Sequence, residues 1–508
     1  MYLKSGRFVF ACALLCLLAC AASAFQSNEN ALADARKALY AARYDQAVDL
    51  YRKCLGENAS ASDAYYGLVR ALLRSHHSQD AIAAADEALR RAPGTAGTEA
   101  AAGMASFRRG DLQKAEEHFR AAVNLDGKYP GGLVGLASIY STVSKFKTAQ
   151  QMRLNAFRFS PDDPDLMLAH ANTLTGADHI AALEQVLAIY NASSEEAHNL
   201  RAHIQTDRAL GDRKLRRLVS PYQASRIKMQ WIYYDPKRIL GAGIRVQINQ
   251  KQSVLLMLDT GASGISLSPK TAEKAGLEML HVETTEAKGV GDEQPQQLQR
   301  YIASEVRAGD VVFADVPVAI FRSARTADFD GLIGADVFQR FLVTIDFFKL
   351  EMSLEPRPHP EPESSTEPED ASDTPPAGFH RAFRFGNHLA LFTSVNRSQP
   401  RLFLIDSGSS SSLIDSAIAH EVASVYKDER VKVRGIQGKV NDTAIANHVS
   451  LVFAGFQQDN SAVYTFNFDK MNDTFGVGLG GVLGFPVLQQ LRVSIDYRDG
   501  VVRFEKAR

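Results

Sequence analysis

Residues 255–267 read LLMLDTGASGISL, in which Asp259-Thr260-Gly261-Ala262-Ser263 stands between two apolar runs. Average amino-acid usage produces an Asp-(Ser/Thr)-Gly triplet by chance in roughly one chain in four of this length. The triplet alone therefore does not establish a site. Its flanking residues, and the presence of a partner elsewhere in the chain, decide what it means.

A second triplet occurs in RLFLIDSGSSSSLID, residues 401–415, where Asp406-Ser407-Gly408-Ser409 also lies between apolar runs. Each triplet is followed by a similar block. The block GLIGADVFQRFLVTIDFFKLEMSLE begins at Gly331, and GVLGFPVLQQLRVSIDYRDGVVRFE begins at Gly481, with no gap between the two in alignment. A triplet with a matched block, present twice, indicates an internal duplication.

The sequence around both triplets is typical of β-strands. After about Ser220, short β-branched and aromatic runs such as GIRVQINQ and FLVTIDF alternate with Gly, Asp and Asn. We expect one β lobe over 228–355 and a second over 379–508. Residues 356–378, PRPHPEPESSTEPEDASDTPPAG, contain too few apolar side chains to build a core and are expected to form a disordered linker.

The N-terminal part of the chain is repetitive. Two sets of small residues recur at intervals of 34 residues: Ala47, Ala81, Ala115 and Ala149, and Cys54, Ala88, Ala122 and Ala156. This period resembles that of tetratricopeptide repeats, which are pairs of antiparallel helices. We expect a helical array over 31–215, with a less regular fifth unit. An Ala-rich bundle without true repeats is the alternative, and the fixed register disfavours it. The resemblance implies a concave groove that binds a protein partner.

The first residues are typical of a secretory signal peptide. Lys4 and Arg7 precede an apolar stretch, and Ala22-Ser23-Ala24 is a small-residue cleavage site, which predicts removal of residues 1–24. In a competing interpretation, Leu17-Leu18-Ala19-Cys20 resembles a bacterial lipobox and places a lipid anchor at Cys20. Both interpretations predict export, to the bacterial periplasm or the exterior.

Charge and cysteine content exclude other classes of function. The formal net charge of the 508-residue chain is -1, which gives no reason to expect a nucleic-acid partner. After signal removal Cys54 is the remaining cysteine, so neither an intramolecular disulfide nor a cysteine-based zinc site is expected. No metal and no cofactor is expected. His76-His77 and the basic run Arg213–Arg217 are interpreted as solvated.

Two Asp-(Thr/Ser)-Gly loops, each followed by an apolar-apolar-Gly element, resemble aspartic proteases. The ending GLIGADVFQRFLVTIDF is similar to the bacterial retropepsin-like aspartyl proteases, and the presence of both halves on one chain resembles the bilobal pepsin arrangement. The resemblance covers about Trp231 to Arg508. It implies a multidomain protein in which an all-α tetratricopeptide solenoid precedes an all-β, double-lobed aspartic protease fold.

The resemblance assigns the catalytic pair to Asp259 and Asp406. The supporting residues of the two loops follow from the same alignment: Thr260 and Ser407, whose hydroxyls hold the loops together; Gly261 and Gly408, which allow close approach; and Ser263 and Ser409, which donate hydrogen bonds to the carboxylates. For the last two, a plain polar loop position is the simpler interpretation.

Paired carboxyl groups suit metal-free peptide hydrolysis. One carboxylate takes a proton from water while the other, protonated, hydrogen-bonds the substrate carbonyl oxygen. Two neighbouring carboxylates do not both ionise readily, so one pKa falls and the other rises. The expected function is an exported aspartic endopeptidase acting on peptide or protein substrates. The alternatives are a homodimer with inter-chain dyads and a non-catalytic binding scaffold.

The cover over the substrate is less defined in the sequence. Lys288-Gly289-Val290-Gly291-Asp292 and Arg434-Gly435-Ile436-Gln437-Gly438 are candidate flaps, with ordinary hairpin turns as the alternative. A flap tyrosine of the pepsin kind is not evident.

Overall fold

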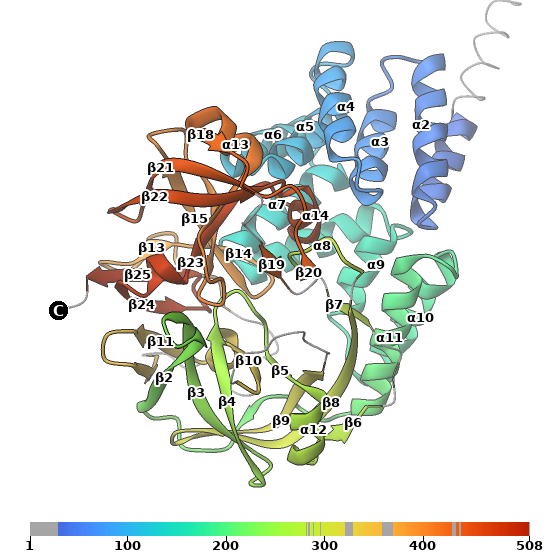
Figure 1. The fold of residues 1–508 in the computed structure, drawn as a ribbon. Helices are drawn as coiled ribbons and strands as arrows, with labels where there is room; N and C mark the ends of the chain where they lie inside the picture. Colours follow the sequence, from blue (N-terminus) through green and yellow to red (C-terminus); the bar gives the residue numbers. More distant parts are fainter. Residues whose placement is uncertain are drawn as a thin grey trace, which may run out of the picture.

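The structure is a computed structural model that describes residues 29–280, 282, 285–287, 289–294, 296–320, 329–357, 369–428, 433–435 and 438–506. The expected signal peptide 1–24, with Cys20, and residues 358–368 of the expected linker lie outside these ranges. Figure 1 shows a stack of helices beside two β-rich lobes. Within the described ranges, no helix is both long and apolar enough to cross a membrane.

The helical stack follows the 34-residue period of the sequence. Residues 29–40 are helical. They are followed by α2 (Tyr44–Glu57), α3 (Ser62–Arg74), α4 (Ser78–Arg91), α5 (Ala96–Arg108), α6 (Leu112–Leu125), α7 (Pro130–Thr142) and α8 (Phe146–Phe159). The starts of α2, α4, α6 and α8 are 34 residues apart. The small residues at both repeated positions are fully buried because they lack the bulk that would separate neighbouring helices.

The period is lost at the end of the stack. The last helices are α9 (Pro164–Ala171), α10 (Gly176–Ile189) and α11 (Glu195–Leu210). This end returns to the beginning of the stack: the Asn191 N–H donates to the Ala41 carbonyl at 2.9 Å, and the Tyr44 hydroxyl donates to Glu196 at 2.5 Å. The last helices therefore contact the start of the stack.

The β-rich region begins with β1 (Arg217–Leu218) and continues into lobe 1. Lobe 1 contains β2 (Ser225–Asp235), β3 (Arg238–Ile248), β4 (Gln252–Asp259), β5 (Ile265–Leu267), α12 (Pro269–Ala275), β6 (Glu278–Met279), β7 (Thr285–Ala287), β8 (Gln296–Ala308), β9 (Val311–Ile320), β10 (Gly331–Gly334), the 3-10 helix η1 (Ala335–Phe338), β11 (Phe341–Asp346) and β12 (Glu351–Pro356).

Lobe 2 repeats this order. It contains β13 (His380–Arg381), β14 (Phe383–Phe385), β15 (His388–Val395), β16 (Arg401–Asp406), β17 (Leu413–Asp415), α13 (Ser416–Val422), β18 (Ser424–Tyr426), β19 (Arg434–Gly435), β20 (Gly438–Lys439), β21 (Ala444–Phe453), β22 (Phe456–Phe466), α14 (Asp469–Phe475), β23 (Leu479–Gly484), α15 (Phe485–Leu488), β24 (Leu491–Asp496) and β25 (Val501–Lys506).

Strand pairing confirms the internal duplication. In lobe 1, β10 is parallel to β4 and antiparallel to β5, and β5 is parallel to β9. In lobe 2, β23 is parallel to β16 and antiparallel to β17, and β17 is parallel to β22. The two halves of the β-rich region therefore share one topology.

A sheet common to both lobes joins them, in the order β13-β25-β24-β11-β12-β2. Its centre is the antiparallel pair β11–β24, in which Thr344 lies opposite Ser494. Their buried hydroxyls are 2.9 Å apart. These residues hold equivalent places in the duplicated blocks, so the local two-fold relation between the lobes passes between them. One apolar core runs through this sheet and both lobes.

The helical stack packs on lobe 2 (Figure 1). A second apolar core contains Leu112 and Phe119 of α6 together with Leu402 and Phe468 of lobe 2. At the edge of the stack, Arg108 of α5 pairs with Asp473 of α14. The stack and lobe 2 are therefore held by both apolar burial and a buried charge pair.

Residues 369–378 belong to the segment expected to be disordered, yet they pack against the stack. Ala371 is 4% exposed, and its N–H donates to the carbonyl of Ser144 at 3.1 Å. Asp373 pairs with Lys145. The expectation of disorder is wrong for this part because its acidic side chains find partners at the turn between α7 and α8.

Candidate active site

Two buried parallel strand pairs carry the triplets. In lobe 1, β4 ends at Asp259, opposite Gly334 of β10. In lobe 2, β16 ends at Asp406, opposite Gly484 of β23. The four residues immediately before each aspartate are apolar and buried. The apolar runs therefore anchor the strands in the core and leave the carboxyl groups at the junction between lobes.

Thr260 and Ser407 join the two loops through reciprocal hydrogen bonds. The Thr260 N–H donates to Ser407 Oγ at 3.0 Å, and the Ser407 N–H donates to Thr260 Oγ1 at 2.9 Å. Each hydroxyl then donates at 2.9 Å to a backbone carbonyl of the opposite lobe, that of Ile405 or Leu258. Both hydroxyls therefore lie where the resemblance implies.

The glycines of the triplets leave room for the opposite carboxyl group. A Cβ atom on Gly261 would overlap the carboxyl group of Asp406, and a Cβ atom on Gly408 would overlap that of Asp259. The two loops thus interlock, and Asp259 and Asp406 of one chain face each other. An inter-chain dyad would require this intramolecular pair to separate.

Backbone donors hold the carboxyl groups in place. Gly261 N–H donates to Asp259 Oδ1 at 2.8 Å, while the N–H groups of Gly408 and Ser409 both donate to Asp406 Oδ1 at 2.9 Å. Burial, followed by the charge of Asp259 and a hydrogen bond with it, raises the pKa of Asp406 well above its ordinary value, and the N–H donors oppose this shift. The coupled pair therefore retains one proton at pH values where an ordinary carboxyl group has released it.

Ser263 and Ser409 use their hydroxyl protons elsewhere. The Ser263 hydroxyl donates to Asp336 at 3.0 Å, and the Ser409 hydroxyl donates to the carbonyl of Ser411 at 2.8 Å. The expectation that these hydroxyls donate to the catalytic carboxylates is corrected, because nearer acceptors take the protons. Ser409 nevertheless supports Asp406 through its backbone N–H.

Asp336 is a site residue that the sequence reasoning missed. It is fully buried and accepts hydrogen bonds from Gly264 N–H at 2.8 Å and from Asn387 of lobe 2 at 2.8 Å. Arg216 approaches it at 3.4 Å. The sequence does carry one sign of a special role for Asp336. The two duplicated blocks differ at this position, where the second block has Pro486. The basic run is therefore not merely a solvated helix end.

The candidate flap segments form hairpins that contact each other. β7 pairs with β8, and β19 pairs with β20. Between the hairpins, Asp292 N–H donates to the Lys439 carbonyl at 3.0 Å, and Lys439 N–H donates to Glu293 at 3.1 Å. Lys288, Ile436 and Gln437 lie outside the described residues. Because the two hairpins bond to each other across the lobes, they are more than isolated turns. That they cover a bound substrate stays a prediction.

Comparison with known proteins agrees with the duplication. The profile of the family described as "Aspartyl protease" matches residues 244–337 and again residues 393–487. No curated protein matches the chain. The crystal structure of basic 7S globulin from soybean is similar at 10% identity and a TM-score of 0.33, covering 56% of this chain and 95% of that chain. The C-terminal region thus carries the aspartyl protease family pattern in each lobe, behind a helical N-terminal region.

Proposed function

We propose that the protein is an aspartic endopeptidase that hydrolyses peptide bonds with a water held between Asp259 and Asp406. The observation that carries this proposal is the interlocking of the two loops, in which each glycine faces the opposite carboxyl group. Such an arrangement has little value for a passive scaffold, because it brings two carboxyl groups together at an electrostatic cost.

In the proposed reaction the two carboxyl groups take different tasks. Asp406, whose pKa is raised, hydrogen-bonds the substrate carbonyl oxygen and transfers its proton to that oxygen as the tetrahedral intermediate forms. The Asp259 carboxylate removes a proton from water as the water oxygen bonds to the carbonyl carbon. When the C–N bond breaks, Asp259 returns its proton to the leaving nitrogen, and Asp406 recovers its own proton from the tetrahedral oxygen.

The helical stack is proposed to be a tetratricopeptide array that docks the substrate or a partner protein. Its helix boundaries follow the period of that family. A cavity of about 520 Å³ is lined by tyrosines of the stack, among them Tyr40, Tyr66 and Tyr129, and by Gly476 of lobe 2. An occupant of the cavity would therefore touch both parts of the chain.

Export to a bacterial periplasm or exterior remains part of the proposal and rests on residues 1–24 alone. Whether the mature chain begins after Ala24 or carries a lipid at Cys20 is resolved by the mass of the protein purified from its membrane and soluble fractions.

Digestion of a diverse peptide library tests the proposed activity. Cleavage that an inhibitor mimicking the tetrahedral intermediate blocks competitively supports an aspartic endopeptidase. A wild-type chain that neither cleaves nor binds such an inhibitor would favour the scaffold. The mass of the active species in solution separates an intramolecular dyad from the homodimer.

A further inference from the structure

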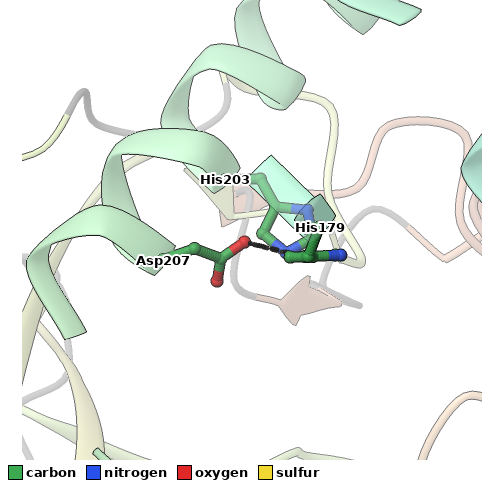
Figure 2. Close-up of side chains that lie close together, drawn as sticks. All are labelled: His179, His203 and Asp207. Carbon is green, nitrogen blue, oxygen red and sulfur yellow. Dashed lines mark hydrogen bonds and ion pairs between the residues drawn. The ribbon is translucent and has the colours of Figure 1, made fainter. Parts of the chain in front are cut away.

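A cluster of two histidines and one aspartate lies at the end of the helical stack, apart from the carboxyl pair. His179 projects from α10, and His203 and Asp207 project from α11 (Figure 2). The spacing of His203 and Asp207 is that of residues on one helix face. The potential ligand atoms of all three side chains lie within 4.8 Å of one another.

The hydrogen bonds of His179 identify which of its ring nitrogens faces the cluster. Its Nδ1 lies 2.8 Å from the backbone carbonyl of Ala171, an atom that can only accept, so Nδ1 carries a proton. In the neutral ring, Nε2 then presents a lone pair to Asp207 Oδ2, 3.3 Å away. Two lone pairs facing each other require a cation, either a second proton or a metal ion. Anchoring of the other ring nitrogen by a carbonyl is also the usual support of a metal-binding histidine.

Two of the three ligand-to-ligand distances suit a tetrahedral ion. Nε2 of His179 and Nε2 of His203 lie 3.3 Å and 3.2 Å from the same Asp207 oxygen. Bonds of about 2.0–2.1 Å with tetrahedral angles place two ligand atoms roughly 3.3 Å apart. The His203 side chain is 51% exposed, which gives an ion a path from solvent.

We propose that His179, His203 and Asp207 bind a divalent transition-metal ion, with Zn²⁺ as the best fit. Imidazole nitrogen and carboxylate oxygen are both zinc ligands, and water would take the fourth position. This site is independent of the proposed protease activity. The proposal differs from the sequence-based expectation that no metal is bound. The sequence does not reveal the site because His179 is far along the chain from the other two ligands.

A bound ion would link the helices at the end of the stack, where the 34-residue period is lost. The site links α10 to α11, and His179 also contacts the C-terminal end of α9 through Ala171. The apolar core beneath this end contains few residues, among them Leu183, Val186 and Leu200. A bound ion would therefore contribute to the stability of the last helices, beyond what their apolar packing supplies.

The test uses the full mature chain without a polyhistidine tag, stripped with a chelator and titrated with Zn²⁺ by calorimetry. The wild type is expected to bind one ion per chain, and His203→Ala and the nearly isosteric Asp207→Asn are expected to weaken binding by more than about tenfold. His198→Ala, on the same helix but outside the cluster, is the matched control and should bind as the wild type does.

Thermal unfolding provides a second readout. Zn²⁺ should raise the Tm of the wild type and of His198→Ala but not that of Asp207→Asn, since an ion that binds the folded state alone stabilises it. Circular dichroism checks that each variant is folded. Absence of binding to the wild type, or equal binding by Asp207→Asn, would overturn the proposal and leave the cluster as protonated histidines paired with an aspartate.

Discussion

Thr260 and Ser407 each accept the backbone N–H of the other, at 2.9 Å and 3.0 Å. Each side-chain hydroxyl therefore accepts one hydrogen bond from the opposite lobe and donates one to a carbonyl of that lobe. Both residues are nearly fully buried, so water does not replace a lost partner. The position of each carboxyl group therefore depends on the integrity of both lobes.

Thr260→Val is expected to destabilise the junction of the lobes by about 1–3 kcal/mol, because it leaves the Ser407 N–H and the Ile405 carbonyl without their partner. Thr260→Ser keeps the hydroxyl and should lie close to the wild type. Trp231 reports on this junction because its ring packs against Phe485 of lobe 2, with centroids 6.0 Å apart. Denaturant unfolding followed by tryptophan fluorescence measures the difference, and equal midpoints for the Val variant and the wild type would contradict the role of the hydroxyl.

Gly261→Ala is expected to lower kcat by about 10²-fold, as for a displacement of about 1 Å at the reacting groups. The added methyl group overlaps the carboxyl group of Asp406 and forces it to move. Gly56→Ala is the matched control, because its Cβ atom meets nothing within 4 Å in helix α2. That substitution should leave kcat unchanged and favour the helix slightly. Peptide hydrolysis by both variants compares them, and a fully active Gly261→Ala would show that the loops are not tightly interlocked.

The raised pKa of Asp406 predicts a pH dependence of stability. The folded chain retains the Asp406 proton at pH values where the unfolded chain has released it, from about pH 4 upward. Because the folded state binds more protons, this residue makes the free energy of unfolding fall as pH rises toward the folded-state pKa. Asp406→Asn removes the contribution of the coupled pair, and the carboxyl groups outside the pair cancel in the comparison. Unfolding of both proteins across pH measures it; identical slopes would contradict a raised pKa.

Arg70→Leu is expected to destabilise the helical stack by about 3–5 kcal/mol, the usual effect of leaving a buried charge without its partner. Arg70 pairs with Asp163 at 2.7 Å, and the side chains are 15% and 6% exposed. The exposed pair Arg52–Asp80, at 3.9 Å, provides the control Arg52→Ala, which should change stability by less than about 1 kcal/mol. Helix loss followed by circular dichroism distinguishes them. Equal stability of the two variants would show that the Arg70 pair does not stabilise the stack.

The sequence predicted the parts of the fold that depend on local pattern. The apolar runs before Asp259 and Asp406 specify buried strands, and the small residues at Ala47 and its repeats specify close helix packing. Each of these features is repeated, so the register could be checked within the chain itself.

The remaining features depend on contacts between distant segments. Asp336 contacts Arg216 and Asn387, and the three residues come from three different parts of the chain. The direction of the Ser263 hydroxyl follows from that same contact. Ala371 looked like part of a disordered linker because its burial depends on the helical stack. None of these contacts produces a repeated pattern in the sequence from which it could be predicted.

The most direct test of one shared dyad is the hydrolysis of a peptide library by the wild type, Asp259→Asn and Asp406→Asn, each with its mass in solution determined. Both substitutions in a monomeric chain are expected to lower activity by about 10²–10⁴-fold, because each removes one of the two proton-transferring groups. Loss of activity in one variant, with the other as active as the wild type, would contradict a dyad shared by Asp259 and Asp406.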